Sequence, residues 1–418
     1  MAKTEKFSEN LEFYKRDYVK WIALILFIGL IVFVFLSEKV LFSDVPQYLA
    51  VGKEFAEISH AKVRNTPGWI YGWFLGKVLS IYPSITAVKV LNLIWYSLSL
   101  LILYLVVKRY EVLVLYLASP LVWYLAPWTN PLHFVSLLFL VTYYLFYKDK
   151  FLFYLFGSLL LGLATAVWWP AFYFSVFFFL SFLYDKKFYF VLVNLIMFLI
   201  TFSFRIIFDW YYFSMPFFST LRGLGSNLAF LVGEAPDGLP EHSILKYFMI
   251  LVIMTPLIYR LVFVNWVKER KTGIFLVLCL ILFLFNFQFR FFISIMPIIV
   301  LLIGTKVNKK ELFLSLFVSL IVVLFLTSGY FSSRDELIKE DLKSIEKDFT
   351  NERFIVGYSG GSEEEAAYLD TIYFGDKIKE FIRYSEYKLW LKKDNLFREY
   401  KFESKSKRLE FLRSKWLD

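Results

Sequence analysis

Long hydrophobic runs alternate with short basic segments through the first 330 residues of the chain. The first run, residues 21–36, carries no charge and follows a lysine- and arginine-containing start. Later basic segments lie at residues 108–109, 148–150, 186–187, 268–271 and 306–310. Lys and Arg gather on the cytoplasmic side of a bilayer, and most intervals between these segments fit an outward and a returning helix of about 17 to 20 residues. The pattern predicts an all-α polytopic membrane protein with about eleven transmembrane helices.

This sidedness places the protein in the cell membrane, with its amino terminus cytoplasmic and its carboxyl terminus outside. Residues 272–305 must turn, because one helix of that length would span roughly 50 Å against a hydrocarbon core of about 30 Å. Arg290 marks the predicted outer turn. Residues 67–82 are predicted to form a helix along the outer surface or dipping into it, because a full span there would invert every later loop. The first outer loop, residues 37–84, is then long.

Composition divides the chain into a cytoplasmic segment over residues 1–20, a transmembrane region over residues 21–330 with an outer loop at 205–242, and a tail over residues 331–418. The tail is polar, with helical spacing at 334–349 and a strand-like stretch at 353–358. We predict that it forms a small α/β domain outside the cell. Its glycine-rich segment at 357–361 lacks both G-x-G-x-x-G and the Walker lysine, so we interpret it as a turn.

The composition agrees with a bilayer environment. Hydrophobic residues make up 59% of the chain, aromatic residues 22%, and the mean hydropathy is +0.59. The net charge of +10 is explained by cytoplasmic loops and lipid headgroups, so nucleic acid is not an expected partner. The single cysteine, Cys279, excludes an intrachain disulfide and a cysteine zinc site.

An acid directly follows the first hydrophobic run. Asp44 lies on the predicted outer side, and Tyr48 follows four residues later, on the same face of a helix. Glu54 comes further along the same segment. An acid near the membrane boundary can act as a general base toward a hydroxyl or as a metal ligand. The alternative is an ordinary solvated carboxylate.

Several cations also fall on the predicted outer side, against the sidedness rule. They are Lys62, Arg64, Arg205, Arg222 and Arg290. Binding a phosphate is the simplest reason for positive charge there. Arg290 lies between two apolar runs, where a guanidinium requires a partner or an anionic ligand. A salt bridge or a lipid headgroup would satisfy the same requirement.

Other polar and aromatic residues on the outer side allow two interpretations. His60, His133 and His242 could join Asp44 around a divalent ion, but they lack H-x-H and H-E-x-x-H spacing and are more typical of simple polar positions. The acids of the second outer loop, with Asp209 among them, are interpreted as mostly solvated charges. Trp69, Trp73, Trp168 and Trp169 fit an interfacial aromatic belt or stacking on a sugar ring.

Five fragments, taken together, resemble the GT-C type of integral membrane glycosyltransferase, which includes protein mannosyltransferases and aminoarabinose transferases. They are FSDVPQYL with Asp44, RNTPGWIYGWFLGKVL, LYLASP, GLATAVWWPAFYF and FRFFISIMP with Arg290. The resemblance covers about residues 20 to 330 and implies a GT-C-like catalytic domain. It departs from the family where Asn130 and His133 replace an acid common in the outer loop before the fourth span, and where Trp169 replaces a lysine.

The resemblance implies a polyprenyl- or dolichyl-phosphate-sugar donor, with mannose the sugar expected from family frequency, and a glycan, lipid or protein acceptor. Asp44 would then deprotonate the acceptor hydroxyl, with inversion at the sugar. Arg64, Arg205, Arg222 or Arg290, or a Mn²⁺ or Mg²⁺ ion held by Asp44 and His133, would neutralise the leaving phosphate. Residues expected to bind substrate are Tyr48, Glu54, Trp69, Asn130 and His133. The competing hypothesis is a transporter or a flippase of glycolipid precursors, but such proteins usually place charge near the midplane of the membrane.

Overall fold

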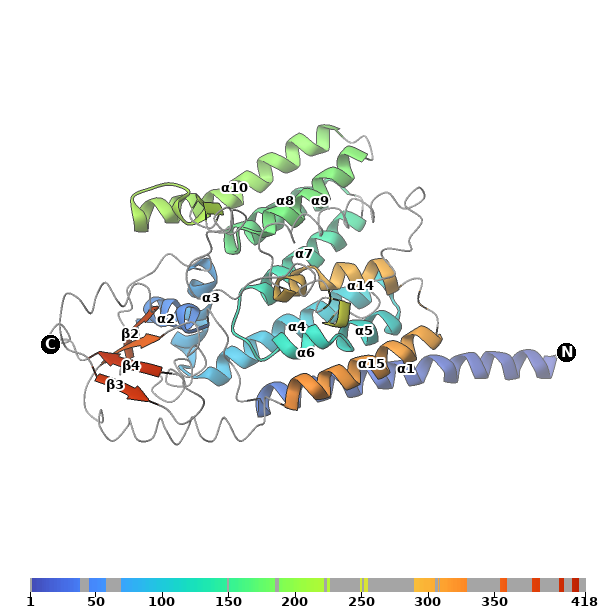
Figure 1. The fold of residues 1–418 in the computed structure, drawn as a ribbon. Helices are drawn as coiled ribbons and strands as arrows, with labels where there is room; N and C mark the ends of the chain where they lie inside the picture. The colour runs from blue at the N-terminus through green and yellow to red at the C-terminus, as the bar shows by residue number, and fades with distance from the viewer. Residues whose placement is uncertain are drawn as a thin grey trace.

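Helices make up most of the described chain (Figure 1). The computed structural model describes residues 2–37, 45–57, 69–148, 150–184, 188–221, 224–225, 249, 252–254, 289–304, 307 and 309–328, with four strands in the tail. The early helices are α1 (Ala2–Leu36), α2 (Val45–Phe55), α3 (Trp69–Ile81), α4 (Ile85–Val107), α5 (Tyr110–Leu117), α6 (Pro120–Leu125) and α7 (Leu132–Tyr147). The later ones are α8 (Phe151–Val167), α9 (Ala171–Tyr184), α10 (Phe188–Phe213), the 3₁₀ helix η2 (Phe289–Ser294), α14 (Met296–Gly304) and α15 (Lys309–Ser328).

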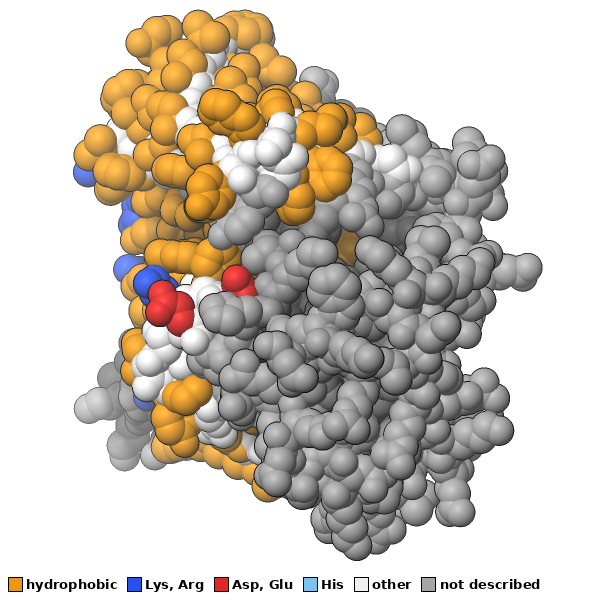
Figure 2. Space-filling view, turned by 90° about the vertical axis from the view of Figure 1, so that its left-hand side faces the viewer, with side chains coloured by type: hydrophobic (Ala, Val, Ile, Leu, Met, Phe, Trp, Pro, Cys, Tyr) orange, Lys and Arg blue, Asp and Glu red, His pale blue; other side chains and the backbone are white. Residues whose placement is uncertain are grey.

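Three helical segments of the described part are long and apolar enough to cross a membrane: Tyr18–Leu36, Ile85–Val107 and Phe188–Tyr211. Shorter apolar helices accompany them, including Leu132–Tyr147 and Phe151–Val167. Hydrophobic side chains also cover much of the described surface in Figure 2. A bilayer is the environment that suits this surface. The number of about eleven helices and their sidedness remain predictions.

One predicted turn coincides with helix ends, and the other expected features are placed in different ways. α8 ends at Val167 and α9 begins at Ala171, so the chain leaves helix at the predicted Trp-Trp-Pro turn. Arg290 lies in the short 3₁₀ helix η2, immediately before α14. Residues 67–82, expected as a surface helix, contain α3, which packs against α2. The expected outer loop at 205–242 begins too early, because α10 continues to Phe213 and includes both Arg205 and Asp209.

α2 and α3 approach closely because glycines line their contact. A methyl group added at Gly52 would lie 2.9 Å from Cβ of Leu75, and one at Gly76 would lie 2.9 Å from the carbonyl oxygen of Gly52. Both positions are tighter than side chains tolerate. Small residues therefore let these two helices pack backbone to backbone, which fixes α2, the helix that directly follows Asp44 in sequence.

α10 has one face toward hydrophobic surroundings and one toward the protein. Its exposed stripe includes Leu192, Leu199 and Ile207, whereas Asn194, Phe198, Arg205 and Asp209 are buried on the other face. The buried face packs against α8. The Asn194 side chain bonds to Ser158, and Thr201 Oγ1 donates a hydrogen bond to the Leu159 carbonyl at 2.7 Å. The charged residues of α10 thus point inward, as expected for a membrane helix.

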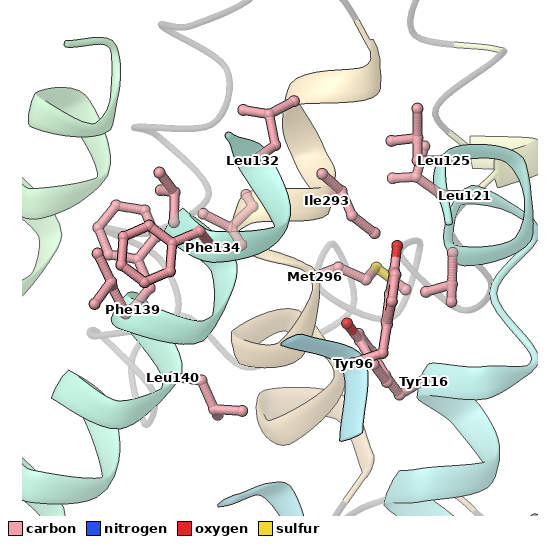
Figure 3. Packing of buried hydrophobic residues seen from close by; sticks show 14 of the residues in the cluster. Tyr96, Tyr116, Leu121, Leu125, Leu132, Phe134, Phe139, Leu140, Ile293 and Met296 are labelled. Carbon is pink, nitrogen blue, oxygen red and sulfur yellow. The ribbon is translucent and has the colours of Figure 1, made fainter. Parts of the chain in front are cut away.

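A buried cluster joins α4 to the helices around it. Figure 3 shows Tyr96 of α4 and Tyr116 of α5 facing Met296 and Ile293, with Leu132 at the start of α7 nearby. All five side chains are at most 3% exposed. The cluster lies where α7 packs against α4, η2 and α14.

The described part of the tail is a four-stranded sheet. Its strands are β1 (Phe354–Tyr358), β2 (Ile378–Arg383), β3 (Arg398–Lys401) and β4 (Arg408–Leu412), in the order β2-β1-β4-β3. β1 pairs in parallel with β2 and antiparallel with β4, which also pairs antiparallel with β3. The strand expected at 353–358 matches β1. The expected helix at 334–349 lies outside the described residues, so the α/β domain stays a prediction.

The close contact of α8 with α10 leads to a first prediction. In Gly162→Ala, the new methyl group would clash with the Phe198 carbonyl and the Thr201 hydroxyl of α10. We expect the variant to lose about 1–3 kcal/mol of stability. Thermal unfolding of the purified protein in detergent measures the loss.

The matched control is Gly225→Ala, because no atom lies within 4 Å of the methyl group it adds. Its unfolding temperature should stay at or above that of the parent. Equal stability of Gly162→Ala and the parent would contradict the close helix contact.

Candidate functional site

The structure describes only part of the predicted site. Asp44, Arg64 and Arg222 lie outside the described residues, as do His60, His242 and Lys62. Asp44 directly precedes α2 in the sequence, and Trp69 is the first residue of α3. Arg205, Arg290, Tyr48, Glu54, Asn130 and His133 are placed.

α2 and α3 carry a buried tyrosine pair. The rings of Tyr48 and Tyr71 meet edge to face, with centroids 5.8 Å apart, and both side chains are buried. Burial raises the pKa of the Tyr71 hydroxyl, the nearby Tyr48 raises it further, and the backbone of Asn130 partly offsets these effects. Tyr71 is therefore a neutral phenol at physiological pH. The pair places α2 beside the segment that carries Asn130.

The Asn92 side chain of α4 holds that segment in place. Its amide nitrogen donates to the carbonyls of Ala126 at 3.2 Å and Trp128 at 2.8 Å. Asn130 then begins the next turn, because its side-chain oxygen accepts from the Leu132 backbone nitrogen at 2.8 Å. Asn130 is only 8% exposed. Its polar atoms shape the loop, and its predicted substrate contact remains untested.

His133 is buried in the same network. Its Nδ1 lies 3.0 Å from the Tyr96 hydroxyl, and its Nε2 lies 2.9 Å from the Leu125 carbonyl oxygen. A carbonyl only accepts, so Nε2 carries the proton and donates to it, while Nδ1 accepts from Tyr96. Both ring nitrogens are engaged inside the protein. Among the described residues no group of three or more His, Cys, Asp or Glu side chains is arranged to hold a metal ion.

Arg205 and Asp209 lie one helical turn apart near the end of α10, and both are fully buried. The expectation that Asp209 is a solvated charge is therefore wrong. Arg205 donates from Nε to Thr220 Oγ1 at 3.0 Å and from Nη1 to the Ala166 carbonyl at 3.1 Å. An acid four residues after an arginine in an apolar stretch was the sequence signal for such a buried pair.

Arg290 is linked to the end of α8 through two aromatic rings. Its guanidinium lies over the Phe291 ring at 5.5 Å, and that ring meets Trp168 edge to face at 5.0 Å. Arg205 binds the carbonyl of Ala166, two residues before Trp168. Arg205 thus contacts the last turn of α8 directly, and Arg290 is linked to the following residue, Trp168, through the Phe291 ring. Arg290 is partly exposed, whereas Arg205 is enclosed.

The tyrosine pair is connected to this turn as well. Tyr48 of α2 is close enough to Arg205 to interact with it electrostatically. The structure therefore brings Arg205 and Tyr48 together, with Asn130 and His133 in the segment beside Tyr71. Trp168 and Trp169 are buried, whereas Trp73 is 41% exposed and carries Lys77 over its ring at 5.7 Å. Of these three tryptophans, Trp73 is the one open to a sugar ring.

This neighbourhood suits an anion better than a cation. The guanidinium groups of Arg205 and Arg290 offer positive charge, and the buried Trp168 and Trp169 offer aromatic surface. Glu54, on α2, is partly buried. No family model, curated protein or solved structure matches the chain.

The His133 network leads to a second prediction. Tyr96→Phe removes the donor to Nδ1 of His133 and leaves a buried acceptor without a partner. We expect a loss of about 1–3 kcal/mol, measured by thermal unfolding in detergent.

Tyr189→Phe is the matched control, because Tyr189 is 69% exposed. It should unfold at the temperature of the parent. If Tyr96→Phe did so too, the hydrogen bond between Tyr96 and His133 would be excluded as a support of the loop.

Proposed function

We propose that this protein is a membrane glycosyltransferase that moves a sugar from a polyprenyl- or dolichyl-phosphate carrier to an acceptor hydroxyl. The observation that carries the proposal is that Arg205 binds the end of α8 while Arg290 is linked to the next residue, Trp168, through the Phe291 ring. Arg205 also interacts with Tyr48 of α2, the helix that follows Asp44. Asp44 and Arg290 belong to fragments that resemble the GT-C family. Mannose is the first sugar to test.

The arginines supply what a phosphate leaving group requires. Arg290 is partly exposed, so its guanidinium can contact a phosphate directly. Arg205 is enclosed behind the same turn, and its charge acts through surroundings of low dielectric constant. The Arg290 guanidinium stabilises the negative charge that grows on the phosphate as the bond to the sugar breaks, whereas the enclosed charge of Arg205 attracts the donor phosphate equally before and during that step.

Asp44 is the proposed general base. Its carboxylate takes the proton of the acceptor hydroxyl, and the oxygen attacks the anomeric carbon from the face opposite the phosphate. The bond between the sugar and the phosphate breaks, and its electron pair leaves with the phosphate, so the configuration inverts. Phosphate is a weak base, so no separate acid is needed to protonate it, in contrast to a glycosidase.

A hydrophobic groove of about 250 Å³ offers space for a hydrocarbon chain. α1, α6 and α15 line it, with Phe33, Trp123 and Leu320 among its residues. α6 also contacts η2, the helix that carries Arg290. We propose that the lipid tail of the donor occupies this groove.

A transporter or flippase is the second candidate. The observation in its favour is the buried pair Arg205 and Asp209 inside an apolar helix, a placement typical of ion and substrate paths. Such a protein would move the lipid-linked sugar across the bilayer without breaking the bond to phosphate.

Transfer assays separate these functions and form the third prediction. The purified parent in nanodiscs, given radiolabelled mannosyl or glucosyl polyprenyl phosphate and an alkyl glycoside acceptor, should release polyprenyl phosphate. Asp44→Asn should lower kcat at least about 100-fold, because proton transfer by a positioned base contributes that much. Arg290→Gln should lower it about 100-fold.

Arg109→Gln and Glu111→Gln are the controls, because these residues form an exposed ion pair 3.6 Å apart, distant in sequence from the site. Both should keep parental activity. Parallel assays with EDTA and with added Mn²⁺ or Mg²⁺ test the metal alternative. If the parent left the donor intact but moved a fluorescent analogue across the membrane of proteoliposomes, the glycosyltransferase proposal would be wrong and the flippase proposal would stand.

A further inference from the structure

The chain folds back tightly after α10. Ser214 and Phe217 both adopt left-handed backbone conformations, with φ of 54° and 62°. Residues other than glycine keep such conformations when the surrounding structure holds them there. The reversal brings Ser219 and Thr220 alongside the last turns of the helix they have just left.

Asp209 holds this returning segment. Its Oδ2 accepts two hydrogen bonds from Ser219, one from the backbone nitrogen at 2.9 Å and one from Oγ at 2.8 Å. Asp209 and Ser219 are both buried. A carboxylate that accepts a backbone and a hydroxyl donor from one residue fixes both the position and the orientation of that residue.

The next residue carries the connection to Arg205. Thr220 Oγ1 accepts the hydrogen bond from Nε of Arg205 at 3.0 Å, while Nη1 of the same guanidinium bonds to the Ala166 carbonyl at 3.1 Å. The planar guanidinium is thus held at two of its nitrogens by two different segments. One of those segments is in turn held by Asp209.

We propose that Asp209 is a positioning residue for Arg205, acting through Ser219 and Thr220. The hydrogen bonds from Ser219 to Asp209 hold these two residues against the end of α10, and we call this connection the clip. The inference rests on the proposed function, because it assigns the charge of Arg205 to the donor phosphate. Without the clip, the Thr220 hydroxyl would move away from Nε of Arg205. The guanidinium would then lose its fixed position beside the Ala166 carbonyl at the end of α8.

A purely structural role for Asp209 makes a different prediction. If Asp209 only satisfied a buried charge, its removal would lower stability and active fraction, and so kcat, without changing how strongly the donor binds. Positioning of Arg205 instead changes the donor KM, because the displaced charge no longer faces the phosphate. The acceptor KM should not move in either case.

Hydrogen exchange tests the clip without any assay of activity. In Asp209→Asn, the amides of residues 214–221 should exchange several-fold faster than in the parent, measured by mass spectrometry in nanodiscs, because one strong acceptor of Ser219 is weakened. Ser203→Ala is the control on the same helix, because Ser203 is partly exposed and its hydroxyl donates locally to the Ile200 carbonyl. Unchanged exchange in Asp209→Asn would overturn the clip.

Kinetics test whether the clip acts on Arg205. Thr220→Val removes the acceptor of Nε and should raise the donor KM about three- to tenfold, with kcat and the acceptor KM near parental values. Thr220→Ser keeps the hydroxyl and should restore the parental donor KM. Asp209→Asn should raise the donor KM by a similar factor.

A double variant completes the test. In an Arg205→Gln background, Asp209→Asn should add no further rise in donor KM, because both changes remove the same positioned charge. Independent, multiplying effects would overturn the proposal, as would a Thr220→Val enzyme with the parental donor KM. Should the parent bind and turn over no donor at all, the proposed function fails and the positioning role with it, while the exchange experiment still decides the clip.

Discussion

Every polar group inside a membrane protein must find its partner within the protein, because hydrocarbon offers none. This constraint organises the whole described site. Lys89 of α4 donates to the carbonyls of Phe35 and Ser37 at the end of α1, at 3.3 and 2.7 Å. Asn92, three residues further along α4, holds the segment after α6, and Arg205 donates to the Ala166 carbonyl at the end of α8. Inward polar side chains on long helices thus fix the irregular segments that carry the candidate site.

Close helix packing makes these bonds possible. Gly162 lets α8 and α10 approach until the backbone of one contacts the other, and Arg205 can then reach the Ala166 carbonyl across the contact. The same principle joins α2 to α3 through Gly52 and Gly76. Stability and site geometry therefore depend on the same contacts. A substitution that separates α8 from α10 therefore displaces the charge of Arg205 as well as weakening the packing of the two helices.

Hydrophobic patterning predicted the helices and turns well where the pattern itself decides them. The helix at α3, the turn before α9 and strand β1 all fall where runs, prolines and alternation placed them. The pattern failed at Arg205 and Asp209, because a charge in a hydropathy profile looks like the end of a span. Whether such a charge is solvated or buried depends on a partner such as Ser219, which the profile does not reveal. His133 was equally ambiguous, because only the fold shows Tyr96 and Leu125 at its ring nitrogens.

The central claim is that a lipid-linked phosphate binds at the turn between α8 and α9. An electron cryomicroscopy structure in nanodiscs with a polyprenyl phosphate tests it most directly. The account predicts phosphate density within hydrogen-bond distance of the Arg290 guanidinium, on the side of the turn that Arg205 supports, with the lipid tail leaving toward α6. Phosphate density at any other place, or a lipid bound with its headgroup away from both arginines, would contradict it.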